Sequence, residues 1–88
     1  MTAYREVERT VEFEPIDGWV YRITEFDDGA IVKRTAASER PVWSHGVLVQ
    51  IYQPAADEFV RASNSVNPWL PSFADALAIV ERCWSKEA

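Results

Sequence analysis

Hydrophobic and polar residues alternate along the first half of the chain, and this alternation predicts β-strands. Across residues 6–14, Val7, Val11 and Phe13 fall on one side and the glutamates on the other, as in a strand with one buried face. Turn residues follow at 15–18 and again at 27–29, where Asp28-Gly29 favours a hairpin. Further strands are predicted at residues 19–26, 30–36 and 46–53.

Residues 54–63 allow two interpretations. Pro54 followed by Asp57 and Glu58 is compatible with a short helix, because proline suits a first helical position. The same residues are also compatible with a turn before a fifth strand at 58–63, and we favour the strand. Residues 63–71 are expected to be irregular.

The C-terminal residues predict an amphipathic helix. Ser72 is a favourable N-cap, and Asp75 three residues later completes a capping-box-like pair. One face of this helix is apolar, and it should pack on the sheet. That face comprises Phe73, Ala76, Leu77, Val80, Cys83 and Trp84.

These elements predict an α+β fold, in which a four- or five-stranded, meander-like antiparallel sheet carries one C-terminal helix on one face. Residues 1–88 would form a single small domain. A five-residue first turn would pair Phe13 with Trp19 and Val11 with Tyr21. This register puts Val7, Val11, Phe13, Trp19, Tyr21, Ile23 and Val32 under the helix. A four-residue turn would move the side chains of the second strand to the opposite faces, because a shift of one residue in register exchanges the two faces.

The favoured register places Glu8, Thr10 and Glu12 beside Arg22, Thr24 and Lys33 on the other face, as a cross-strand charge ladder. One helix cannot cover both faces of a sheet, so an apolar surplus remains on this outer face. We expect that surplus to support a homodimer. Its members are Val20, Phe26, Ile31, Leu48 and Tyr52.

The charge distribution adds a candidate binding surface. The formal net charge is −5, and all of it lies in residues 1–28. A nucleic-acid or membrane-surface partner is therefore not expected, because both are polyanions. The acidic row of the first strand could dock on a basic protein, although it could equally be a solvated edge that blunts strand pairing. The row comprises Glu6, Glu8, Glu12 and Glu14.

Two further features are candidates for binding. Lys33, Arg34 and Arg40 lie close together in the sequence near Trp43 and could contact an anion. Trp43 and Trp69 occupy proline-flanked loops, where they could anchor a protein partner or fold back onto the core.

The residues that catalysis needs are scarce. The chain has one histidine, His45, and one cysteine, Cys83, which is expected on the apolar face of the helix. This excludes the usual zinc ligand sets and disfavours a Cys-His pair. The three glycines fit turns or strand ends and do not form a phosphate-binding loop. We expect neither enzymatic activity nor a metal or other cofactor.

The sequence therefore predicts a non-enzymatic protein-interaction module of unknown process, which binds a protein partner through the outer sheet face and the acidic first strand. The alternatives are a small-ligand-binding domain, or a weak nucleic-acid or anion contact through residues 33–46. The single cysteine and the absence of a long apolar run predict a cytoplasmic protein that does not enter a membrane. Its compactness suggests a bacterium or a mobile element as the source.

Overall fold

The computed structural model describes residues 9–13, 18–37, 43, 48–63 and 65–87, with side chains described as far as Cys83. This part of the chain contains five strands and one helix. The elements are β1 (Arg9–Glu12), β2 (Trp19–Phe26), β3 (Gly29–Ala36), β4 (Val49–Gln53), β5 (Glu58–Arg61) and α1 (Phe73–Glu87).

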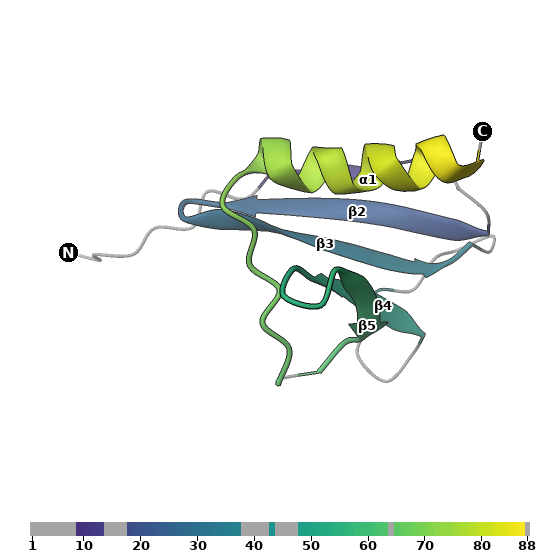
Figure 1. Cartoon of the computed structure of the whole chain (residues 1–88), viewed down its shortest axis with the longest axis horizontal. Coiled ribbons are helices and arrows are strands. Elements are labelled where there is room, and N and C mark those ends of the chain that lie inside the picture. Colours follow the sequence, from purple (N-terminus) through teal and green to yellow (C-terminus); the bar gives the residue numbers. More distant parts are fainter. Residues whose placement is uncertain (1–8, 14–17, 38–42, 44–47, 64, 88) are drawn as a thin grey trace.

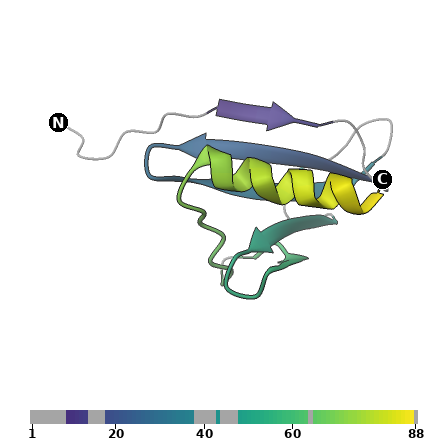
Figure 2. The same ribbon diagram turned by 45° about the horizontal axis from the view of Figure 1, so that its top comes forward.

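The five strands form one antiparallel sheet in chain order, with β1 and β5 at its edges. Helix α1 lies over β2 and β3 on one face of this sheet (Figures 1 and 2). The predicted α+β meander with one C-terminal helix is confirmed. Residues 58–61 form a strand, so the favoured interpretation of the 54–63 segment is also confirmed.

The register between β1 and β2 keeps the predicted faces but differs from the predicted pairing. Val11 lies opposite Ile23, and the Phe13 amide donates a hydrogen bond to the Tyr21 carbonyl oxygen at 2.9 Å. The shift from the predicted Val11–Tyr21 pair is two residues, which leaves every side chain on its predicted face. Val11, Tyr21 and Ile23 therefore share the helix-covered face. Glu12 lies opposite Arg22 on the outer face, as the charge ladder requires.

The side chains of β4 lie on the opposite faces of the sheet from those predicted. The strand pairs Val49 with Thr35 and Ile51 with Lys33, so Val49 and Ile51 lie on the outer face. Tyr52 consequently lies on the helix-covered face, where it is buried in the core, and its predicted place on the outer face is wrong. Leu48 precedes the strand and is exposed. A one-residue difference in register accounts for the reversal.

The hydrophobic core lies between the sheet and α1. Its buried members come from three strands, the segment before the helix and the helix itself. They are Tyr21, Ile23, Ala30, Val32, Tyr52, Leu70, Ala76 and Val80. Phe73, Leu77 and Cys83 pack against this cluster, which confirms the predicted apolar face of the helix as far as the side chains are described.

The N-terminus of α1 has the predicted cap. The Ser72 hydroxyl donates to the Asp75 carboxylate at 2.8 Å and accepts a longer hydrogen bond from the Asp75 amide at 3.3 Å. The carboxylate also suits the positive end of the helix dipole. The helical residues that the structure describes do not form a helix long and apolar enough to span a bilayer.

Candidate interaction surface

The face of the sheet opposite α1 has a buried part and an open part. In the buried part, Val20, Thr35 and Val49 lie side by side on three neighbouring strands and are at most 7% exposed. Nearby, the Arg22 guanidinium lies over the ring of Trp43, with its central carbon 4.3 Å from the ring centroid. Val20 is therefore on the predicted face, but it is not available to a partner in this structure.

The open part carries an aromatic pair, of which one ring is exposed. Phe26, at the end of β2, packs edge-on against Trp69, with ring centroids 5.4 Å apart and planes at 71°. Trp69 is 46% exposed, and Phe26 is half-buried. Ile31, also half-buried, lies on the same face in β3. We call Phe26, Ile31 and Trp69 the aromatic patch.

A short backbone bridge positions Trp69. The next residue, Leu70, exchanges two hydrogen bonds with Ala30 of β3, at 2.9 and 3.0 Å. A Cβ on the neighbouring Gly29 would lie 2.5 Å from the Leu70 carbonyl oxygen and 3.3 Å from the Trp69 ring. The absence of a side chain at Gly29 thus lets the segment before α1 approach β3 closely. This isolated bridge at the neighbouring residue holds Trp69 beside Phe26.

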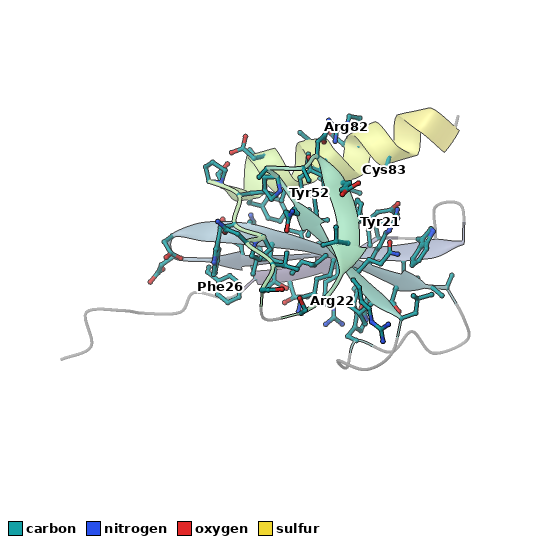
Figure 3. The ribbon with its side chains drawn as sticks, turned by 60° about the horizontal axis from the view of Figure 1, so that its bottom comes forward. Tyr21, Arg22, Phe26, Tyr52, Arg82 and Cys83 are labelled. Atoms are coloured by element: carbon teal, nitrogen blue, oxygen red, sulfur yellow. The ribbon has the colours of Figure 1, made fainter. Side chains whose placement is uncertain are left out.

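Charges lie at both ends of the aromatic patch. The turn between β2 and β3 consists of Asp27 and Asp28, which are exposed and form no ion pair with the residues that the structure describes. At the other end, Arg22 and Lys33 lie directly opposite each other across β2 and β3. Arg22 donates to Glu12 at 2.6 Å. Along this hairpin, the two carboxylates of the turn, the aromatic patch and the two cations therefore follow one another in that order. Phe26 and Arg22, two members of this series on β2, are labelled in Figure 3.

The predicted anion-contact residues do not converge. Lys33 and Arg34 are consecutive in β3 and lie on opposite faces of the sheet, while Arg40 is outside the described residues. Arg34 lies on the helix-covered side among aromatic rings, with its central carbon 4.2 Å from the Phe59 centroid and 4.4 Å from that of Trp19. It also donates to the Gln50 side chain at 2.7 Å and to the Tyr21 hydroxyl at 3.1 Å.

A second polar group links the helix to the β4–β5 turn. Tyr52 donates a hydrogen bond to Asp57, and Arg82 of α1 binds the same carboxylate oxygen at 2.6 Å. Burial raises the pKa of Tyr52, and the hydrogen bond to Asp57 raises it further, whereas Arg82 lowers it. Burial also raises the pKa of Tyr21, with a lowering effect from the Arg34 hydrogen bond and a raising effect from Cys83. Tyr21 and Tyr52 both point toward α1 (Figure 3).

The other predicted site residues are distributed as follows. In the acidic row, Glu12 is exposed and paired with Arg22, while Glu6, Glu8 and Glu14 lie outside the described residues, as does His45. Trp43 is half-buried against Arg22, and Leu48, just before β4, is 52% exposed. Within the described residues, no three His, Cys, Asp or Glu side chains are grouped so that they could hold a metal ion.

Sequence reasoning missed how these residues are grouped. It assigned Trp69 to a loop anchor and Phe26 and Ile31 to self-association, but did not place the three together. The only local signal was Gly29, which we interpreted as a turn residue. It lacks the positive φ of such a residue and instead makes room for Leu70 and Trp69. The chain matches no protein-family model, no curated protein and no solved structure.

Proposed function

We propose that this protein is a non-enzymatic interaction module that binds another protein chain through the aromatic patch. The observation that carries the proposal is Trp69, which is 46% exposed while its ring packs against Phe26. Tryptophan is among the residues that contribute most to binding energy in protein interfaces. Because the Leu70–Ala30 bridge holds Trp69 in place, less conformational entropy is lost on binding than for a free loop.

The position of the patch supports a role in recognition rather than in stability. Trp69 lies on the outer face, and the core on the other side of the sheet is formed without it. We propose the cytoplasm as the compartment, since the chain has a single cysteine. A bacterial or mobile-element source remains part of the same proposal. Anion binding by Lys33, Arg34 and Arg40 is less well supported, because Lys33 and Arg34 lie on opposite faces.

The test compares two exposed apolar positions. Trp69→Ser removes the centre of the patch, and Leu48→Ser is the matched control, because Leu48 is also exposed but lies just before β4. The complex would be isolated from the protein's own cells and its components identified by native mass spectrometry, and binding would then be titrated with purified components. We expect Trp69→Ser to weaken binding by at least about 30-fold.

Leu48→Ser should leave the affinity within about twofold of the unchanged protein, since it lies outside the patch. Thermal unfolding of both variants would check that the fold is retained. Equal binding by the Trp69 variant and the unchanged protein would remove the aromatic patch, and with it the proposed function.

A further inference from the structure

We infer that the protein which the aromatic patch fits is a second copy of this chain, stacked face to face about a twofold axis. The inference rests on the proposed function, because it uses the same surface. It is carried by the order of side chains along the β2–β3 hairpin, which has negative charges at one end, the aromatic patch in the middle and positive charges at the other end. If a second copy runs in the opposite direction, its positive end lies against the negative end of the first.

Cross-strand pairs define this order. Within the hairpin, Arg22 is paired with Lys33, Thr24 with Ile31, and Phe26 with Gly29. Trp69 lies beside Gly29. The Asp27–Asp28 turn closes the hairpin. Pairs on one face of a sheet follow each other at about 7 Å, so the Phe26–Gly29 pair lies about 14 Å from the two cations, and the turn carboxylates about one residue further, at about 17 Å. The aromatic patch lies between the two charged ends.

Consider a twofold axis that lies midway between two stacked sheets, parallel to their planes and perpendicular to the strands. Rotation about this axis reverses the order of the side chains in the second copy. It places β2 over β2 and β3 over β3. When the axis passes between the Thr24–Ile31 pair and the Phe26–Gly29 pair, each Asp28 faces the Lys33 of the other copy. Each Phe26 then faces the other Thr24, and each Trp69 the other Ile31. All these contacts occur twice, as a closed twofold interface requires.

The electrostatics favour this occupant. Asp27 and Asp28 are exposed, and neither they nor Lys33 form an ion pair with the residues in the described part of the chain. Among the residues that the structure describes, the carboxylate end carries two negative charges and the other end is net positive, because Glu12 offsets one of the two cations there. Stacking in the reverse direction brings opposite charges together at both ends, and charge complementarity of this kind fixes the register of an interface.

The packing is also compatible with a dimer. Two sheets stack about 10 Å apart with their strands nearly aligned, and side chains of the two inner faces interdigitate. Because α1 covers the opposite face, each helix would remain on the outside, and the dimer would have four layers. The self-association set predicted from sequence is reduced to Phe26 and Ile31. Val20 is buried within the monomer, Tyr52 lies under the helix, and Leu48 lies outside the patch.

Charge reversal tests the arrangement. Asp28→Lys places lysine against Lys33 of the second copy, and Lys33→Glu places glutamate against Asp28. Each variant alone should raise the dissociation constant of the dimer at least about tenfold. An equimolar mixture of the two variants should restore dimerisation, because every contact in the mixed dimer again joins opposite charges. The double variant, Asp28→Lys with Lys33→Glu in one chain, should dimerise by itself for the same reason.

Sedimentation velocity over a concentration series gives the dissociation constants, and native mass spectrometry separates the mixed dimer from the others by mass. Glu81→Lys on the exposed side of α1 is the control, since it makes the same reversal far from the patch. Circular dichroism melting checks the fold. If a charge reversal impairs folding, Asp28→Asn and Lys33→Gln test the same contacts, because each removes a charge without introducing the opposite one.

The outcomes separate this inference from the proposed function. Restoration in the mixture, with neither reversal variant dimeric alone, supports the face-to-face dimer. A monomer at every concentration, together with a complex with another protein that Trp69→Ser abolishes, overturns the second copy as the partner but supports the proposed function. A dimer unaffected by either reversal overturns the arrangement. If Trp69→Ser alters neither the dimer nor any other complex, both proposals fail.

Discussion

At the scale of single residues, Gly29 has the most specific structural role. Its backbone conformation is not one that requires glycine, since its φ is not positive. What requires glycine is space, because a Cβ would lie 2.5 Å from the carbonyl oxygen of Leu70. The contact is with backbone, which cannot rotate away as a flexible side chain can. Gly29 therefore links the core residue Leu70 and the exposed Trp69 to the sheet.

Gly29→Ala should destabilise the fold by about 1–3 kcal/mol, the usual cost of overpacking a tight contact. Urea unfolding measures this loss. Hydrogen exchange at the Ala30 and Leu70 amides should also accelerate, because their two hydrogen bonds would be displaced. An unchanged unfolding midpoint with unchanged exchange would show that the segment before α1 moves away without cost, contrary to the role we assign to Gly29.

Arg34 shows what the sequence could not indicate about the candidate site. Its position next to Lys33 suggested a shared cationic patch, yet alternation along β3 separates the two side chains. The rings that surround Arg34 come from Trp19 of β2 and Phe59 of β5, which are far apart in the sequence. Which rings meet a cation depends on the register of four strands. Such a contact is determined by tertiary structure and has no local pattern.

At the scale of elements, those with strong periodicity were predicted well. Strand β2 and helix α1 follow the alternating and the helical pattern, respectively, and tight turns limit the possible pairings of β2 and β3. Strand β4 was assigned to the wrong face, because the long connection after β3 does not fix its register. The aromatic patch was missed as a unit for a similar reason. Trp69 reaches Phe26 through the long-range pairing of Leu70 with Ala30.

The cap of α1 yields a prediction at this scale. Ser72→Ala removes the acceptor of the Asp75 amide and the donor to its carboxylate, so we expect the free energy of unfolding to fall by about 1 kcal/mol. Ser72→Asn should retain most of the stability, because asparagine also caps helices well. Ser63→Ala is a matched control at an exposed serine outside the helix. Equal stabilities for Ser72→Ala and the control in urea unfolding would show that the cap contributes little.

At the scale of the whole molecule, two buried tyrosines connect the sheet to the helix. Tyr21 lies between Arg34 of β3 and Cys83 of α1, and Tyr52 is linked through Asp57 to Arg82. Their hydroxyls are buried under α1, where a tyrosinate would be poorly solvated. The protonation state of these two hydroxyls is therefore coupled to the packing of the helix on the sheet.

This coupling predicts a loss of stability in alkaline solution. The pKa of Tyr21 and that of Tyr52 are raised above the ordinary value of 10.0, mainly by burial, so the folded state holds these protons more tightly than the unfolded chain does. Their contribution is complete below pH 10.0 and is lost as the pH rises through the folded-state pKa. Each unit of pKa elevation corresponds to about 1.4 kcal/mol.

Urea unfolding between about pH 8 and about pH 11 tests this coupling. We expect Tyr21→Phe and Tyr52→Phe each to lower the stability at neutral pH, because each removes hydrogen bonds, and to flatten the alkaline decline, because each removes one ionising group. Comparison of each variant with the unchanged protein isolates the contribution of the substituted tyrosine. If both variants decline as steeply as the unchanged protein, the burial of the two hydroxyls does not control its alkaline stability.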